Sequence, residues 1–383
     1  MYDILTLNKI AKCGTDAFDK AKYTVADAVE NPDAIMVRSA AMHDMQFGNK
    51  LLAIARAGAG VNNIPVDRCA EEGIVVFNTP GANANAVKEL VIAGLLLSSR
   101  KVTDAIDWVS TLKGQEDIGK KVEKGKSNFA GPEISGKTLG VIGLGAIGIL
   151  VANAAAELGM DVYGADPYLS VENALKLSGK VHYVKSNKEI FEKCDYITLH
   201  VPALPDTKGM INAEAIASMK KTVRLLNFAR DTLVDEKAII DALANGGMAC
   251  YVTDFATDGL IGLDGVVAMP HLGASTPESE DNCAVMAVRE IVDYIENGNI
   301  RNSVNLPNVE MAISGNAKIC VIHKNAEGLL NNITAPVSAA GLNIENMVSK
   351  SKKDYAYTCL DVKGDASGIE AAIKAVSGVV SVR

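Results

Sequence analysis

Three ionisable side chains, Arg230, Asp258 and His271, each follow a short apolar run in the middle of the chain. A guanidinium can hold a carboxylate and polarise a carbonyl. An imidazole exchanges a proton near neutral pH, and a neighbouring carboxylate would raise its pKa and fix its tautomer. Together these residue types suit hydride transfer between a nicotinamide and a hydroxy acid. Taken singly, each has an ordinary alternative, a surface ion pair for Arg230 and a satisfied core histidine for His271.

The second piece of chemistry is a glycine-rich stretch, TLGVIGLGAIGILVANAAAELGMDVYGAD, at residues 138–166. Gly143, Gly145 and Gly148 have G-x-G-x-x-G spacing between an apolar strand and a helical segment, as in a dinucleotide-binding βαβ unit. The first glycine permits a tight turn, the second lets the backbone approach a pyrophosphate, and the third lets the helix pack closely on the strand. An ordinary glycine turn is the alternative, and the flanking strand and helix argue against it.

Asp166 ends the second strand of this unit, about 20 residues beyond the glycines, where a carboxylate would hydrogen-bond the adenosine ribose. Residues 167–170 contain no Arg or Lys to hold a 2′-phosphate, so the sequence predicts NAD rather than NADP. The apolar run 139–156 is long enough to raise a membrane-spanning alternative. Its glycines and its strand-turn-helix pattern favour a soluble core instead.

The elements that must position these groups alternate along the chain. Apolar runs at 4–7, 34–37, 52–55 and 74–77 are separated by helical stretches, which predicts a parallel α/β sheet. Ligands of such sheets bind beyond the carboxyl ends of the strands. The residues after two of these runs are therefore candidate substrate-binding groups: Arg38, Ser39, Arg56, Gly58, Ala59 and Gly60. Surface ion pairs are the alternative for the two arginines.

Two further α/β stretches complete the pattern. Strands at 196–201, 223–228, 249–255 and 266–269, with a helix at 233–243, continue the domain that holds the glycines. Helices are predicted at 86–99 and 277–295, and the second can carry the chain back to the first domain. Residues 108–137 are rich in glycine and lysine, which predicts an extended arm of the kind that often makes a dimer contact.

The C-terminal part predicts a separate small domain. Residues 309–317 look like a linker, and residues 318–383 give a βαββαβ order, which is typical of a ferredoxin-like domain. The predicted fold class is thus α/β, with two doubly wound parallel-sheet (Rossmann-like) domains and this C-terminal domain. We expect a substrate-binding domain at 1–92 and 277–308, and an NAD-binding domain at 93–276.

Composition narrows the expected partners. The 383 residues carry a formal net charge of −8 without a dense basic run, so neither nucleic acid nor an anionic membrane is expected as a partner. The seven cysteines are scattered, mostly in apolar surroundings, which favours reduced core thiols over a disulfide framework or a metal site. The N-terminus shows no signal-peptide pattern, and we expect a cytoplasmic protein.

Several motifs, in order, carry a resemblance that covers essentially the whole chain. They are RAGAGVNNI (56–64), NTPGANANAVKEL (78–90), GKTLGVIGLGAIG (136–148), LHVP (199–202), NFAR (227–230), VTDF (252–255), PHLGAST (270–276) and NSVNLP (302–307). With them the chain resembles the D-isomer specific 2-hydroxyacid dehydrogenase family, and most closely those members that act on 3-phospho-D-glycerate.

The resemblance implies roles for individual residues. Arg230 would bind the substrate carboxylate and carbonyl, and His271 would be the acid/base. The family's third catalytic residue, a glutamate, corresponds to Asp258, with Asp254 as the alternative. Asp231 stands where a glycine usually follows the arginine. Asn83 joins the substrate-binding group, and the implied cofactor contacts are Gly143, Gly145, Ala146, Ile147, Gly148, Asp166, His200, Val201, Pro202, Asn227 and Asp254.

The C-terminal domain resembles the amino-acid-binding ACT domain, in which L-serine binds between neighbouring subunits. His323, Asn325 and Asn343 occupy the matching effector positions, although the turn Asn325-Ala326-Glu327-Gly328 lacks the usual proline. L-serine is therefore a candidate effector, and a homodimer or homotetramer is expected.

The expected reaction is NAD-dependent oxidation of 3-phospho-D-glycerate to 3-phosphohydroxypyruvate, the first step of L-serine biosynthesis, without a metal. Arg38 and Arg56 would contact the substrate phosphate. One alternative keeps the chemistry and changes the substrate, as a glycerate or glyoxylate/hydroxypyruvate reductase. Another is a non-catalytic NAD-sensing regulator on the same scaffold.

Overall fold

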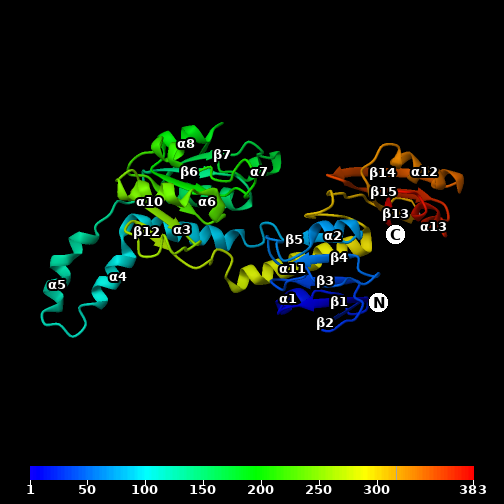
Figure 1. The fold of residues 1–383 in the computed structure, drawn as a ribbon, viewed down its shortest axis with the longest axis horizontal. Coiled ribbons are helices and arrows are strands. Elements are labelled where there is room, and N and C mark those ends of the chain that lie inside the picture. Colours follow the sequence, from blue (N-terminus) through cyan, green and yellow to red (C-terminus); the bar gives the residue numbers. More distant parts are fainter. Residues whose placement is uncertain (316) are drawn as a thin grey trace. The chain divides into compact units, whose positions relative to one another are not determined.

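The computed structural model describes residues 1–315 and 317–383, and the chain forms two compact units. Unit 1 contains Met1–Ala82 and Pro277–Arg383, and unit 2 contains Asn83–Thr276. Figure 1 shows both termini in unit 1. Unit 1 is therefore assembled from segments that are distant in the sequence, while unit 2 is one continuous segment.

Unit 2 is built on a seven-stranded sheet in the order β12-β11-β10-β9-β6-β7-β8, and all its neighbouring strands are parallel. The strand order reverses between β6 and β9, and ligands of open parallel sheets bind at the carboxyl ends of the strands beside such a reversal. The strands are β6 (Thr138–Ile142), β7 (Asp161–Ala165), β8 (Val181–Tyr183), β9 (Tyr196–Leu199), β10 (Arg224–Asn227), β11 (Cys250–Thr253) and β12 (Val266–Ala268).

Helices cover both faces of this sheet, which makes unit 2 a doubly wound α/β layer as the sequence predicts (Figure 1). On one face, α3 (Ala84–Arg100) and α6 (Ala146–Glu157) bury Val91, Leu95 and Val151 against the strands. The other face is covered by α8 (Asn187–Lys193), α9 (Ala213–Ala217) and α10 (Glu236–Ala244). A short helix, α7 (Val171–Lys176), follows β7.

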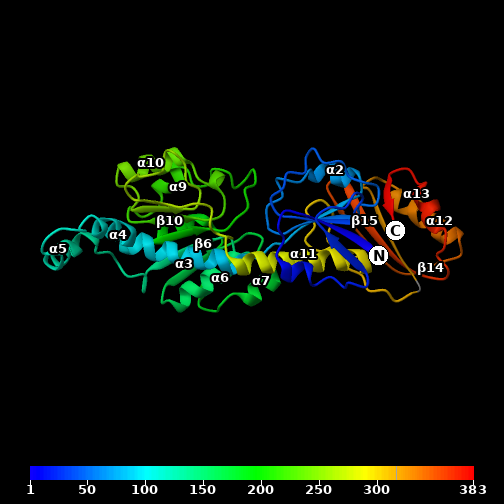
Figure 2. The ribbon, with the colours of Figure 1, turned by 90° about the horizontal axis from the view of Figure 1, so that it is seen from below.

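The glycine-rich arm is helical, which differs from the extended segment that its composition predicts. It comprises α4 (Val102–Ser110), α5 (Ile118–Gly125) and the 3-10 helix η1 (Lys126–Phe129). In Figures 1 and 2 the arm extends away from the sheet of unit 2. Trp108 packs on Phe129 with ring centroids 5.2 Å apart, and a Cβ at Gly125 would lie 2.4 Å from the indole. That glycine therefore lets α5 approach the tryptophan of α4.

Unit 1 contains a five-stranded parallel sheet in the order β2-β1-β3-β4-β5. One face packs on α2 (Val66–Glu71), and the opposite face packs on the long helix α11 (Pro277–Asn297), which in turn contacts the short α1 (Lys12–Thr15). The strands are β1 (Tyr2–Leu7), β2 (Tyr23–Ala26), β3 (Ala34–Val37), β4 (Ala53–Arg56) and β5 (Val75–Asn78).

The C-terminal part of unit 1 is a four-stranded antiparallel sheet in the order β14-β15-β13-β16, with the predicted βαββαβ sequence of elements. Its helices α12 (Leu329–Ala339) and α13 (Ile369–Lys374) cover one face. The opposite face buries Cys320, Tyr357 and Cys359 in the same core as Tyr294 of α11. The strands are β13 (Ala317–Lys324), β14 (Asn343–Lys352), β15 (Tyr355–Lys363) and β16 (Val379–Val382).

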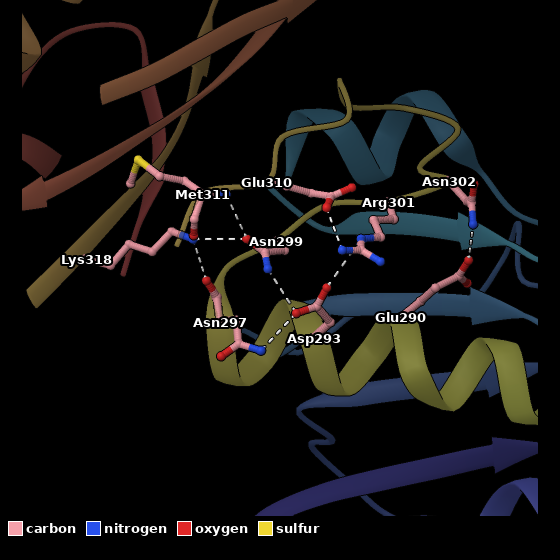
Figure 3. A network of polar contacts seen from close by, with 9 residues as sticks. All are labelled: Glu290, Asp293, Asn297, Asn299, Arg301, Asn302, Glu310, Met311 and Lys318. Carbon is pink, nitrogen blue, oxygen red and sulfur yellow. Dashed lines mark hydrogen bonds and ion pairs between the residues drawn. The ribbon is translucent and has the colours of Figure 1, made fainter. Parts of the chain in front are cut away.

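A polar network fixes the join between this sheet and the end of α11 (Figure 3). The Lys318 ammonium donates to the Asn299 Oδ1 at 3.1 Å and to the Met311 carbonyl at 2.7 Å. The Asn299 amide donates to Asp293 of α11 at 3.0 Å, and Arg301 pairs with the same carboxylate. The antiparallel sheet is thus tied to α11 by hydrogen bonds as well as by its apolar face.

Candidate active site

The turn after β6 shows why each glycine of the motif is required. Gly143 has φ +96°, and a Cβ there would lie 2.5 Å from the His200 carbonyl oxygen. At Gly148 a Cβ would lie 1.9 Å from the Gly143 carbonyl oxygen. A Cβ at Gly145 would meet no described atom within 4 Å, so this residue leaves open space above the helix N-terminus. The turn is therefore a backbone cradle with room for a pyrophosphate.

Asp166 lies at the carboxyl end of β7 and closes the cradle. Its Oδ2 accepts the Leu144 N–H at 2.8 Å, and its Oδ1 accepts the Tyr168 N–H at 2.8 Å. Each carboxylate oxygen keeps a second lone pair, which suits a ribose hydroxyl. Tyr183 of β8 donates to the Asp166 carbonyl at 3.1 Å. These residues fit NAD, whose adenosine ribose carries free hydroxyls.

The other predicted cofactor residues surround the same turn. Ala146 and Ile147 form the first turn of α6, directly after the cradle. His200, Val201 and Pro202 follow β9, and the His200 backbone crosses against Gly143. The His200 Nε2 lies 3.0 Å from the Thr198 Oγ1, and burial lowers the pKa of this histidine, so the imidazole is neutral. His200 thus adds no positive charge to the cradle.

The predicted arginine is presented by a turn that Asn227 builds. Asn227 is fully buried at the end of β10, and its Nδ2 donates to the Arg230 carbonyl at 2.9 Å. Its Oδ1 accepts the Ala229 N–H at 3.2 Å. The Arg230 side chain is exposed, with Nη1 donating to the Ala229 carbonyl at 2.6 Å. Asn227 therefore shapes the backbone that carries the guanidinium.

Two carboxylates were candidates for the partner of His271, and the structure separates them. Asp254 is 2% exposed, and its Oδ2 accepts the Gly273 N–H at 3.1 Å. Burial raises the pKa of Asp254, whereas the Gly273 N–H and the charges of His271 and Arg230 act in the opposite direction. Its Oδ1 is buried without a hydrogen-bond partner among the described residues. Asp254 is thus electrostatically coupled to both predicted catalytic residues.

Asp258 lies in different surroundings. It is exposed in a turn beyond β11, and among the described residues it makes no hydrogen bond or ion pair with His271. The neighbouring Thr257 donates to the Glu236 Oε2 at 2.9 Å, which ties that turn to α10. His271 itself is exposed and packs edge-on against Phe255, with ring centroids 4.9 Å apart.

The substrate-binding candidates of unit 1 form a connected loop cluster. Arg38 pairs with Glu280 of α11 at 2.7 Å, and the Asn8 Oδ1 accepts the Ser39 N–H at 3.0 Å. The Arg56 Nε donates to the Arg38 carbonyl at 3.1 Å. Gly58 has φ +146°, and a Cβ there would lie 2.1 Å from the Arg56 Nη1. The glycine therefore lets the Arg56 guanidinium lie over the loop.

The rest of this loop is held by its neighbours in unit 1. Asn78, at the end of β5, donates to the Ala59 carbonyl at 2.6 Å, and the Thr79 N–H donates to the Gly58 carbonyl at 3.1 Å. Gly60 follows in the same loop. Asn83, the remaining candidate, is the first residue of unit 2 and precedes α3.

The predicted effector positions lie on the C-terminal sheet with different exposures. His323 is 4% exposed, and its ring nitrogens lie 2.7 Å from the Lys324 carbonyl and 2.8 Å from the Thr358 Oγ1. Asn325 and Asn343 are exposed, bonding the Lys353 carbonyl and Glu345 respectively. Of the three, only the two asparagines present side chains to solvent.

Neither a metal site nor a membrane-spanning helix is found among the described residues. Within residues 1–315 and 317–383, no group of His, Cys, Asp and Glu side chains is arranged to hold a metal ion. The same residues include no helix of the length and apolar character that a bilayer crossing requires.

Comparison with known proteins places these features in context. A sequence model of the D-isomer specific 2-hydroxyacid dehydrogenase NAD binding domain matches residues 92–273. The D-3-phosphoglycerate dehydrogenase of Haemophilus influenzae is 33% identical over 350 residues, covering 87% of this chain and 81% of that protein. The Bacillus subtilis protein of the same name is 32% identical over 378 residues, covering 93% and 69%.

A solved structure is similar to this chain in both sequence and fold. The NAD+-bound 3-phosphoglycerate dehydrogenase of Entamoeba histolytica has a TM-score of 0.61 and 28% identity, covering 79% of this chain and 98% of that one. Unit 2 is an NAD-binding domain, and its glycine cradle and Asp166 are the parts that fit the cofactor.

Proposed function

Because the chain belongs to the D-isomer specific 2-hydroxyacid dehydrogenase family, we propose that it oxidises 3-phospho-D-glycerate to 3-phosphohydroxypyruvate with NAD, as the first step of L-serine biosynthesis. The observation that supports this substrate most is the span of the similarity. The Bacillus subtilis relative, named for this substrate, aligns with 93% of the chain, so the similarity extends beyond residues 1–308 into the C-terminal sheet.

In this proposal the catalytic work falls to residues at the carboxyl ends of β10 and β11 and at the residue after Pro270. Arg230 holds the substrate carboxylate and polarises the C2 oxygen. His271 takes the C2 hydroxyl proton as general base. When bound, NAD supplies the hydride-accepting nicotinamide. Asp254 stabilises the imidazolium that forms on His271, because it is the buried carboxylate on which the charges of His271 and Arg230 act.

We assign the substrate phosphate to the loop cluster of unit 1. Arg38 and Arg56 bring two positive charges to a protein whose net charge is −8. Between Gly58 and Gly60, beyond the carboxyl end of β4, the only side chain is the Ala59 methyl group, and the Gly58 N–H donates to the Arg56 carbonyl at 2.8 Å. The Ala59 and Gly60 N–H groups are therefore the ones we assign to an anion. In this assignment residues 1–92 and 277–308 serve the substrate, 93–276 the cofactor, and 318–383 regulation.

The test is NADH formation with 3-phosphoglycerate, compared with glycerate, D-lactate and 2-hydroxyglutarate. Turnover that is largely confined to the phosphorylated acid supports the proposal. Arg38→Gln and Arg56→Gln should each raise KM for 3-phosphoglycerate while leaving any slow turnover of glycerate unchanged. Preference for unphosphorylated acids would contradict the substrate assignment and favour a glyoxylate/hydroxypyruvate reductase. No turnover of any acid would favour the NAD-sensing regulator.

Regulation and assembly complete the proposal. We assign L-serine to the exposed Asn325 and Asn343 and expect a homodimer or homotetramer. Repeating the assay with millimolar L-serine tests the effector, with Asn343→Ala as the variant that should lose inhibition. Light scattering on the purified protein measures the number of subunits, and a monomer would contradict the expected assembly.

A further inference from the structure

Cys320 and Cys359 lie directly opposite each other in the C-terminal sheet. They are register partners in the antiparallel strands β13 and β15, and their sulfur atoms are 3.8 Å apart. All seven cysteines are reduced in the structure. The scattered positions of the cysteines in the sequence predict reduced core thiols, but they do not predict that two of these thiols are neighbours in the fold.

The backbone hydrogen bonds show that the pair can be bridged. The Cys320 N–H donates to the Arg383 carbonyl at 2.8 Å, and its carbonyl accepts the Arg383 N–H at 3.0 Å. Both backbone groups of Cys320 therefore point away from β15, which makes Cys320 and Cys359 a non-hydrogen-bonded pair. Cα atoms of such pairs are about 4.5 Å apart, within the range of about 4.4–6.8 Å that disulfides span.

The surroundings tolerate either oxidation state. Around the sulfurs lies Gly298, where a Cβ would be 2.5 Å from the Cys320 Sγ. The Gly298 carbonyl accepts the Tyr357 hydroxyl at 2.8 Å, so it keeps a hydrogen bond if the Cys359 thiol proton is lost. The neighbouring Asn297 and Asn299 are fixed by Lys318 in the network of Figure 3. To form an S–S bond of about 2.05 Å, the two side chains must close a gap that is now 3.8 Å.

The two thiols are also chemically unequal. The hydrogen bond between the two sulfur atoms and the nearby Arg383 guanidinium lower the pKa of Cys320, whereas the pKa of Cys359 is raised by that same hydrogen bond and by burial. Thiolates are the nucleophilic form of cysteine. Cys320 is 5% exposed and its backbone bonds Arg383, the residue directly after the short edge strand β16, while Cys359 is fully buried. Cys320 is therefore the thiol that an oxidant reaches when the edge strand frays.

We propose that Cys320 and Cys359 are a reversible oxidation site that forms an intrachain disulfide between β13 and β15 in the presence of hydrogen peroxide. The Cys320 thiolate attacks the peroxide, forming an S–O bond and breaking the O–O bond, with hydroxide taking up a proton to become water. The Cys359 thiol then attacks the Cys320 sulfur, an S–S bond forms and a second water leaves. Two thiols are oxidised and one peroxide is reduced, and a dithiol reductant reverses the step.

The experiment treats the reduced full-length protein with limiting hydrogen peroxide, then removes the peroxide and alkylates the protein in denaturant, because six of the seven cysteines are buried in the fold, and maps the modified cysteines by mass spectrometry. We expect titratable thiols to fall from seven to five per chain, with the loss shared by Cys320 and Cys359. The intact mass should fall by about 2 Da, and dithiothreitol should restore it. Oxidation should also raise the thermal midpoint, because the bridge cross-links two strands.

Matched variants separate the pair from the other thiols. Cys320→Ser and Cys359→Ser should each abolish both the mass loss and the gain in thermal midpoint. Cys250→Ser, a buried cysteine of unit 2, should keep both effects. The proposal is overturned if the exposed Cys13 is oxidised while Cys320 and Cys359 remain alkylatable, or if the bridge joins a different pair. Because no substrate is used, its failure would leave the dehydrogenase proposal untouched.

Discussion

At the carboxyl edge of the seven-stranded sheet, the turn after β6 differs from the three segments that follow β10, β11 and β12. The turn between β6 and α6 does its chemistry with backbone: Gly143, Gly145 and Gly148 shape a cradle in which side chains are absent. In the proposed function, the segments after β10, β11 and β12 contribute side chains instead, namely Arg230, Asp254 and His271. A backbone cradle is specified by residues that are adjacent in sequence. A side-chain constellation depends on how three separate loops converge.

The difference explains where sequence reasoning became ambiguous. In the cradle, a Cβ at Gly148 would lie 1.9 Å from the Gly143 carbonyl oxygen. Only glycine fits at this position, so the glycine spacing identifies the turn without ambiguity. In the constellation, Asp254 and Asp258 are four positions apart and chemically identical. Only burial distinguishes them, since Asp254 is 2% exposed whereas Asp258 lies in solvent.

Substituting His271, the proposed general base, should separate catalysis from cofactor binding most clearly. His271→Gln should lower kcat by about 10³-fold while NAD binding stays unchanged, because general bases contribute roughly 10²–10⁴-fold. The matched control is His182→Gln, a surface histidine 3.0 Å from Asp161 that lies on β8. Steady-state kinetics and NAD titration measure both effects. Equal losses in the two variants, or loss of NAD binding with His271→Gln, would contradict the division of labour.

The next experiment decides between the two carboxylates. Asp254→Asn should lower kcat by about 10²-fold, because the imidazolium that forms on His271 during the reaction loses the buried negative charge that stabilises it. Asp258→Asn should change kcat less than threefold or so, since solvent screens a charge at that position. A reversed ranking would show that the turn after β11 brings Asp258 to the histidine during turnover.

A third prediction concerns a buried carboxylate outside the proposed site and the way its ionisation affects the stability of the fold. Glu290 of α11 is 6% exposed with its Oε2 unpartnered, as in Asp254, but its hydrogen-bond partner is the neutral Asn302 at 2.8 Å. Burial raises its pKa to about 8 from 4.5. A pKa that is higher in the folded state stabilises the fold below pH 4.5, and this contribution is lost as pH rises toward 8.

Glu290→Gln should therefore raise the free energy of unfolding by roughly 4 kcal/mol at pH 8 and by no more than about 1 kcal/mol at pH 5. Denaturant unfolding at the two pH values measures this. Asp293→Asn, a more exposed carboxylate on the same helix, is the control and should show no such gain. Stabilisation by Glu290→Gln that is equal at both pH values would mean that packing, rather than ionisation, sets the effect.

The smallest expected effect concerns Gly145 in the cofactor turn after β6. Gly145→Ala should raise the Kd for NAD about tenfold without changing the thermal midpoint, because its Cβ would meet no protein atom but would intrude on the cradle. Gly179→Ala is the control, since its Cβ also meets nothing within 4 Å and it lies away from the turn. Unchanged NAD affinity in Gly145→Ala would place the pyrophosphate elsewhere.

The order of the helices and strands and the position of the cofactor turn could be predicted from the sequence. Glycine spacing, short apolar runs and the terminal Asp166 are local signals, because a turn's allowed backbone angles and a strand's burial depend on neighbouring residues. From these signals followed the two parallel sheets, the βαββαβ domain and the NAD site. The arm was the exception, since its glycines obscured a helical pattern that Trp108 and Phe129 stabilise by packing.

The contacts between side chains that are distant in the sequence could not be predicted and are seen in the folded chain alone. The fold placed Asp254 rather than Asp258 within the electrostatic reach of His271, paired Arg38 with Glu280, and set Cys320 opposite Cys359. These partners lie between 17 and 242 positions apart in the chain. Their encounters depend on strand register and loop path, which arise from the packing of the whole unit and leave no periodic mark on the residues themselves.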